Sequence, residues 1–200
     1  MRLKKFAWNL IFFTGFIAAC TNPFSLRTPE PPVLNSGQNT LNLQSDPDSL
    51  LKKMQIAFEE RNSTYYMETL SSPETTGKAF VFVPEKSESY RFTGWNRNEE
   101  SNYFFNLTNQ ADLQGVTLRF YEKEEWRQYA GSVDTLTINV SYDIVVKKLT
   151  ESQRFTGQAA FTVIRNKLSQ WYIWQWEDFK RSDDQTEGTW STLKANYRVQ

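Results

Sequence analysis

Histidine is absent from this sequence, and cysteine occurs once, at position 20. Histidine is the commonest general base near neutral pH and the commonest protein ligand of zinc, so triad-type hydrolysis and the usual zinc sites are excluded. A single cysteine cannot form a disulfide within the chain, and the eight glycines are scattered and form no phosphate-binding loop. We therefore expect no metal and no cofactor, and a fold that depends on its apolar core.

An excess of positive charge is also missing. Lys and Arg number 23, and Asp and Glu number 23 as well, which gives a formal net charge of zero. Proteins that bind nucleic acid neutralise phosphates with clustered Lys and Arg. The composition therefore argues against nucleic acid as a partner.

The first 19 residues have the layout of a secretory signal. Arg2, Lys4 and Lys5 precede an apolar run from Phe6 to Ile17, and two small residues follow. This run is too short for a permanent membrane span, which needs about twenty residues. Without the signal, 20 basic side chains remain against 23 acidic ones.

The residues at the end of this signal, Ile17-Ala18-Ala19-Cys20, resemble the lipobox of bacterial lipoproteins. The resemblance implies that the thiol of Cys20 carries a diacylglycerol, that the signal is cut before Cys20, and that the new amine is acylated. Two or more acyl chains anchor a protein stably to a membrane. Because residue 21 is Thr and not Asp, the resemblance implies an outer-membrane protein that faces the periplasm. The alternative is a plain secretory signal with an incidental cysteine.

After Cys20, the composition divides the chain into two parts. Residues 20–45 are rich in proline and polar residues and lack periodic apolar positions, which predicts a flexible tether. Residues 46–200 contain many aromatic residues, each of which can bury on the order of 150–250 Å². We expect this second part to be one folded domain.

Four helices are predicted within the domain. Asp46-Pro47 is a helix start, and Asn62-Ser63 starts a second short helix that Ser71-Ser72-Pro73 stops. Asn96, with Glu99 three residues later, predicts a capping box and a helix to about residue 106. The segment Thr189–Tyr197 has aromatic and apolar residues at helical spacing, and we expect it to dock by its aromatics.

The strands follow a period of two. Residues 135–146 alternate most clearly, and shorter patterns predict strands at 79–83, 116–121, 155–163 and 171–176. Helices followed by a long antiparallel meander predict an α+β domain with helices packed on one face of a curved sheet.

This order of elements resembles the nuclear transport factor 2-like, or cystatin-like, superfamily over residues 46–198. The quoted motifs are Ala57-Phe58-Glu59-Glu60-Arg61-Asn62 and Trp171-Tyr172-Ile173-Trp174-Gln175-Trp176-Glu177-Asp178. The resemblance implies a cone-shaped domain whose open end sometimes holds a small ligand. Candidate residues lining this cone are Trp95, Tyr142, Phe161 and Trp176. It also implies dimerisation through the outer face of the sheet, for which the candidates here are Thr135, Thr137, Asn139 and Ser141.

Carboxylates are the catalytic groups that remain. Some enzymes of the superfamily move a proton with an Asp in the cone and stabilise an oxyanion with a Tyr. Asp143 adjoins Tyr142, but neighbouring strand residues point to opposite faces, so we expect Asp143 in solvent. We interpret Glu177 and Asp178 as polar residues at a strand end. The aromatic residues of 171–176 are interpreted as core, with a sugar- or base-stacking surface as the alternative.

Together these patterns predict a non-enzymatic, lipid-anchored protein of the cell envelope that binds a partner or a small apolar ligand. One alternative is a carboxylate-based lyase or isomerase, which requires a buried acid with a raised pKa facing a Tyr in a pocket. A second alternative is an assembly protein, or a homodimer, that works through the face of its sheet.

Overall fold

The computed structural model describes residues 43–181, 186 and 188–198, all within one compact unit, Asn39–Gln200. The predicted signal, Cys20 and most of the predicted tether lie outside the described residues. Gln44 is buried, and its main-chain oxygen accepts a hydrogen bond from the Trp171 amide at 2.8 Å. The fold therefore includes the last residues of the predicted tether.

The predicted helices are confirmed, and two further helical elements were missed. The first two helices are α2 (Pro47–Glu59) and α3 (Ser63–Glu68), and the later ones are α5 (Arg97–Thr108) and α6 (Trp190–Asn196). The second helix ends before Ser71, as predicted, but the prediction missed that Ser72 caps a further helix, α4 (Pro73–Thr76). Residues Lys86–Phe92, for which no helix was predicted, form a 3-10 helix, η2.

Side-chain caps explain where the helices begin. The Asp46 carboxylate accepts from the Ser49 amide at 2.9 Å, and the Asn62 side chain accepts from the Tyr65 amide at 3.0 Å. The capping box predicted for α5 is only half formed. Asn96 accepts from the main chain, but the Glu99 carboxylate accepts a bond from Arg198 at 3.1 Å.

One six-stranded sheet forms the other layer. Its order is β1-β6-β5-β4-β2, and β3 pairs with β4 off this path. The strands are β1 (Val81–Val83), β2 (Leu113–Tyr121), β3 (Arg127–Tyr129), β4 (Ser132–Lys148), β5 (Ser152–Arg165) and β6 (Trp171–Phe179). The sheet is antiparallel as predicted except for β1, which runs parallel to β6. The short strand β3 was not predicted; all three of its residues are exposed, so it lacks the apolar alternation that marks a strand.

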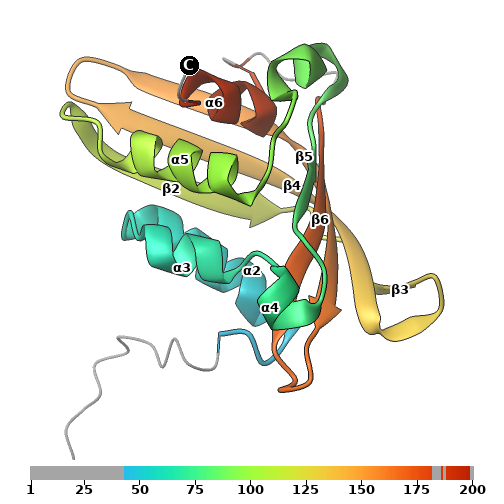
Figure 1. The fold of residues 1–200 in the computed structure, drawn as a ribbon. Coiled ribbons are helices and arrows are strands. Elements are labelled where there is room, and N and C mark those ends of the chain that lie inside the picture. Colours follow the sequence, from blue (N-terminus) through green and yellow to red (C-terminus); the bar gives the residue numbers. More distant parts are fainter. Residues whose placement is uncertain (1–42, 182–185, 187, 199–200) are drawn as a thin grey trace, which may run out of the picture. The chain divides into compact units, whose positions relative to one another are not determined.

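The core lies between the helices and one face of the curved sheet (Figure 1). The predicted alternation of β4 is confirmed, because Ile138, Val140, Tyr142, Ile144 and Val146 are each at most 1% exposed. The helices α5 and α6 lie over the part of the sheet formed by β2, β4 and β5, and α3 and α2 lie next to α5 (Figure 1). The hairpin formed by β3 and the start of β4 extends beyond the helical layer.

Candidate functional site

The interior of the cone is filled by aromatic rings. Tyr142, Phe161 and Trp176, three of the predicted lining residues, are fully buried. Tyr142 and Trp176 pack against Trp190 of α6, and Phe161 packs against Trp176. The centroid of the Trp190 ring lies 4.1 Å from that of Trp176 and 5.1 Å from that of Tyr142. Three of the four candidate residues therefore lie in the buried core. The sequence also predicted that the Thr189–Tyr197 helix docks by its aromatics, and Trp190 does so; what it did not indicate is that this ring lies against Tyr142 and Trp176 inside the cone.

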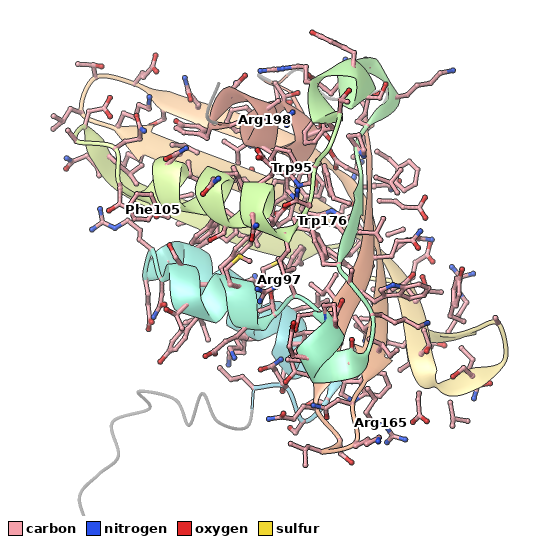
Figure 2. The ribbon with its side chains drawn as sticks, in the orientation of Figure 1. Trp95, Arg97, Phe105, Arg165, Trp176 and Arg198 are labelled. Carbon is pink, nitrogen blue, oxygen red and sulfur yellow. The ribbon has the colours of Figure 1, made fainter. Side chains whose placement is uncertain are left out.

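Trp95, the fourth predicted lining residue, lies at the edge of this cluster. It is partly buried, packs against Phe82 and Phe92, and donates its indole N–H to Glu100 at 2.7 Å. Figure 2 labels Trp95 and Trp176 in the region where α5, β1 and β6 meet. At least three hollows open on the described surface, and none of these three is lined by any of the four predicted residues.

Asp178 was wrongly interpreted as a polar residue at a strand end, because it is only 2% exposed. The register of β6 against β5 shifts by one residue at Trp174, since Thr162 pairs with Gln175 and Val163 pairs with Ile173. This β-bulge reverses which residues point inward, so Trp176 and Asp178 face the core. Sequence alternation alone cannot reveal such a shift.

The carboxylate of Asp178 holds the start of α6. It accepts bonds from the Tyr142 hydroxyl at 2.6 Å, from the Ser191 amide at 2.7 Å and from the Ser191 hydroxyl. The Tyr142 hydroxyl in turn accepts from the Trp190 amide at 2.7 Å. Burial raises the pKa of Asp178, although these hydrogen bonds oppose the shift. Burial, followed by the charge of Asp178, raises the pKa of Tyr142 well above its usual value.

A second buried carboxylate, Glu100 of α5, meets Lys194 of α6. Their charged atoms lie 2.6 Å apart and both side chains are 0% exposed. Glu100 also accepts hydrogen bonds from the Tyr66 hydroxyl and from the Trp95 indole. The Lys194 ammonium lies 3.6 Å from the ring centroids of Trp176 and Phe82. Burial lowers the pKa of Lys194 to about 8, against the opposing effect of Glu100.

Sequence reasoning missed this ion pair, although a signal for it exists. Glu100 stands three, four and seven residues before Tyr103, Phe104 and Leu107, which is helical spacing. Lys194 stands four residues after Trp190 on the other helix. A charged residue on the apolar face of each of two helices predicts a buried pair, because an unpaired buried charge is very costly.

The two other predicted acids lie on the outer face of the sheet. Asp143 points away from Tyr142, as predicted, and receives two bonds of 2.9 Å from the Arg154 guanidinium. Glu177 accepts a bond from the Gln175 side chain at 2.7 Å. Neither acid faces the interior, so neither shares a site with Tyr142.

The residues predicted for a dimer interface are only partly available. Thr135 and Ser141 are 6% and 1% exposed, whereas Thr137 and Asn139 are half-buried on the outer face. The Ser141 hydroxyl donates to Glu122 at 2.8 Å and accepts from Arg181 at 3.0 Å. Two of the four predicted residues are therefore covered by the protein itself.

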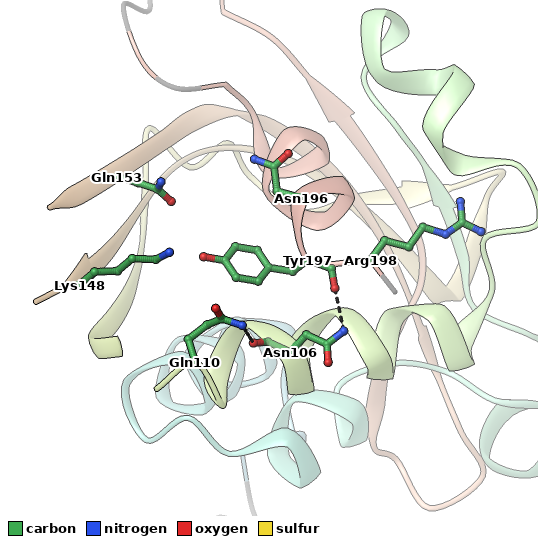
Figure 3. Close-up of a pocket in the computed structure, with 7 residues that line it drawn as sticks. All are labelled: Asn106, Gln110, Lys148, Gln153, Asn196, Tyr197 and Arg198. Atoms are coloured by element: carbon green, nitrogen blue, oxygen red, sulfur yellow. Dashed lines mark hydrogen bonds between the residues drawn. The ribbon is translucent and has the colours of Figure 1, made fainter. Parts of the chain in front are cut away.

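One hollow, which we call the carboxamide pocket, opens between α5, α6 and the hairpin end of β4 and β5. Its volume is about 420 Å³. Four of its lining residues carry carboxamides, and the complete lining is Asn106, Gln110, Gln153, Asn196, Lys148, Tyr197 and Arg198 (Figure 3). In this view the Tyr197 ring extends between Gln110 and Gln153 toward Lys148.

Two further hollows meet between α4 and the turn from β5 to β6. They share Thr75, Gln170 and Tyr172, and their volumes are about 380 and 730 Å³. The smaller one contains the buried Lys53, whose ammonium lies 2.7 Å from Glu68 and 2.9 Å from the Gln44 side chain. Both of these neighbours also line the hollow, so its most buried charge is already satisfied.

Two other kinds of site were searched for among the described residues. No group of three or more Cys, Asp or Glu side chains there has the geometry to hold a metal ion. No helix in the described ranges is both long and apolar enough to span a membrane.

Comparison with known proteins identifies the fold. No family model matches the sequence, and no curated protein matches it either. A protein of Novosphingobium aromaticivorans described as a candidate aromatic ring hydroxylase is similar in structure, with a TM-score of 0.52 and 12% identity over 73% of this chain and 92% of that chain. A candidate scytalone dehydratase from the same organism gives a TM-score of 0.51 and 8% identity over 66% of this chain and 78% of that chain.

A nuclear transport factor 2-like superfamily protein of Salmonella enterica serovar Typhimurium is also similar. Its TM-score is 0.50 and its identity is 11%, over 74% of this chain and 99% of that chain. Identities this low show the fold and not the activity. The chain has the α+β fold of nuclear transport factor 2-like proteins, with helices packed on one face of a curved sheet, as the sequence resemblance implied.

Proposed function

We propose that this chain is a non-enzymatic binding protein of the cell envelope, anchored by lipid on Cys20 at the outer membrane and facing the periplasm. The observation that carries the non-enzymatic part is the position of Trp190. Its ring occupies the centre of the cone, where a substrate of a cone enzyme would have to lie. The domain then acts through its outer surface.

Displacement of α6 from the cone is expensive. Exposure of the Trp190 ring, about 200 Å² of mostly apolar surface, costs about 5 kcal/mol. Separation of Lys194 from Glu100 leaves a buried charge without its partner, which costs about 3–5 kcal/mol. Together these costs are comparable to the whole stability of a domain, about 5–15 kcal/mol. The cone would therefore open about as rarely as the domain unfolds.

Native-state hydrogen exchange on the full-length chain tests this proposal. The amides of Trp190 and Ser191 donate into the cone, to Tyr142 and Asp178. We expect both amides to exchange with the free energy of global unfolding, like the central amides of the β4–β5 ladder. Exchange of the two α6 amides at a free energy lower by about 3 kcal/mol or more, with the ladder still protected, would show that the cone opens on its own.

The anchor is supported by the basic, apolar and small-residue segments that lead to Cys20. Its test is incorporation of labelled palmitate into the full chain expressed in a Gram-negative bacterium. We expect the wild type to be labelled and to fractionate with the outer membrane. Cys20→Ser should be unlabelled and should retain its signal. Equal processing and fractionation of both proteins would refute the anchor.

A second candidate function, a carboxylate-based lyase or isomerase, is favoured by one observation. Asp178 is a buried acid with a raised pKa that receives a hydrogen bond from Tyr142. However, the groups of α6 already bond to both side chains, so a substrate must first replace them. Independent opening of α6 in the exchange experiment would favour this enzyme over the binding protein.

A homodimer or another protein partner on the outer face of the sheet is compatible with the proposed binding role. No described helix covers that face (Figure 1), and Phe179 at its edge is 45% exposed. Light scattering of the purified chain at rising concentration tests for self-association. A strictly monomeric protein would exclude the homodimer, and the outer face would then have to bind a different protein.

A further inference from the structure

The carboxamide pocket combines hydrogen-bond donors and acceptors without a carboxylate in its lining. Its side chains come from three separate parts of the chain: α5, the β4–β5 hairpin and the end of α6. At about 420 Å³, it falls within the range of roughly 300–1,000 Å³ that is usual for ligand sites. It lies outside the cone, so a ligand could occupy it with α6 in place.

Internal hydrogen bonds fix the amide nitrogens of this pocket. Asn106 donates to the Tyr197 carbonyl at 2.9 Å, Gln110 donates to the Asn106 carbonyl at 2.8 Å, and Gln153 donates to Glu151 at 2.9 Å. These bonds orient the three side chains before any ligand arrives. No bond to the carboxamide oxygen of any of the three is recorded among the described residues, so these oxygens can accept from a ligand.

The donors come from other residues of the lining. The side-chain oxygen of Asn196 accepts from Arg91 at 3.0 Å, which leaves its NH₂ group to donate. The Lys148 ammonium lies 3.8 Å from Asp112, a separation that leaves it room for a further acceptor. Tyr197 adds a hydroxyl and a ring face, with Lys148 located 6.0 Å from the ring centroid.

This inventory distinguishes among ligand classes. An anion needs donors alone, and the one guanidinium of the pocket, Arg198, is already bonded to Glu99 and to the Arg91 and Thr93 carbonyls. A cation would meet two positive side chains. An apolar ligand would remove water from seven polar residues without replacing their hydrogen bonds. A hydroxyl both donates and accepts, so a ligand with several hydroxyls can satisfy both sets of groups.

We propose that the carboxamide pocket binds a neutral, polyhydroxylated ligand, namely a segment of oligosaccharide, with Gln110 and Gln153 accepting from its hydroxyls and Tyr197 stacking on a sugar ring. This inference rests on the proposed binding function and names the class of ligand. The anchor would keep such a domain close to envelope glycans.

Isothermal titration of the full chain, purified in detergent with its N-terminal segment intact, tests the inference. The probes are chitotetraose, maltotetraose and, for the anion alternative, citrate. We expect at least one oligosaccharide to bind with a Kd below about 10 mM. We expect citrate not to compete with it.

Variants then locate the binding. Gln110→Leu/Gln153→Leu removes two acceptors, and we expect at least tenfold weaker binding. Gln158→Leu is the matched control, because it changes an exposed glutamine on the outer face of the same strand as Gln153, and its binding should equal that of the wild type. Both variants should unfold at a urea concentration close to that of the wild type.

Three outcomes would overturn the inference: no binding of either oligosaccharide, equal binding by the double variant and the wild type, or binding of citrate in their place. None of these outcomes alters the exchange of the Trp190 amide. If no saccharide binds but the α6 amides stay protected from exchange, the inference about the pocket fails and the non-enzymatic binding role remains. An α6 that opens independently would refute that role whatever the titration shows.

Discussion

The buried pair of Lys194 and Glu100 allows a sharp prediction about what holds α6 in place. Lys194→Met keeps the length of the side chain but leaves Glu100, at 0% exposure, without its cation. The remaining donors to Glu100 are the Tyr66 hydroxyl and the Trp95 indole, which offset only part of this loss. Loss of one partner of a buried pair costs about 3–5 kcal/mol, so we expect a loss of this size in the free energy of unfolding.

The chain contains a matched control for this experiment. Lys123 lies 2.7 Å from Asp48, and Asp48 also accepts from a tryptophan indole, that of Trp126, at 2.7 Å. The Asp48 carboxylate thus has the same kinds of partner as the Glu100 carboxylate, but the side chains of Lys123 and Asp48 are 41% and 57% exposed. Water screens the pair, so Lys123→Met should cost less than about 1 kcal/mol.

Urea unfolding followed by tryptophan fluorescence, at pH 7, measures both variants. The double variant Glu100→Gln/Lys194→Met should be more stable than Lys194→Met alone, because no uncompensated charge remains in the core. A cost of less than about 1 kcal/mol for Lys194→Met, equal to that of Lys123→Met, would refute the reasoning that this pair secures α6.

Three further predictions concern the same core. Trp190→Ala should lose about 3–5 kcal/mol in urea unfolding, because it empties the centre of the cone; a loss below about 1 kcal/mol would mean that the ring does not fill it. Gly157→Ala should lower the melting temperature by several degrees in calorimetry, since its Cβ would clash with the Tyr142 hydroxyl and would lie 2.6 Å from the Phe179 carbonyl; an unchanged value would contradict this close approach. The pKa of Lys194 is about 8 in the folded state and 10.5 in the unfolded state. Between pH 8 and pH 10.5 the unfolded chain therefore binds more protons at this group than the folded chain does, so the free energy of unfolding rises with pH. The rise from pH 8 to pH 9.5 is about 2 kcal/mol. The difference in unfolding free energy between wild type and Lys194→Met, measured at both pH values, should grow by this amount, and a difference independent of pH would disprove the assignment.

Local patterns were sufficient to predict most of the fold. The strict alternation of residues 135–146 indicated a strand with one buried face, and the structure confirms it within β4. Asp46 and Asn62 indicated the helix starts because their side chains satisfy otherwise unpaired amides. In both cases the local structure depends on residues that are close together in the sequence, so it can be predicted from the sequence.

The details of the interior could not be predicted in the same way. The bulge at Trp174 depends on how β6 pairs with β5, and it turned Asp178 from an expected surface residue into the acceptor that holds α6. The pairing of Lys194 with Glu100 joins residues 94 positions apart. Tertiary packing determines both features. The spacing within each helix can place Glu100 and Lys194 on apolar faces, but it does not show that the two side chains meet.

The location of Trp190 in the chain has a consequence for the order in which the core can form. Every strand of the sheet is synthesised before Trp190, yet the space at the centre of the core stays empty until that residue is present. A chain that emerges from the ribosome without α6 therefore has a cavity the size of an indole ring and an unpaired Glu100. Both features keep it far from its native stability. The core of the described domain can therefore be completed only after α6 has been synthesised.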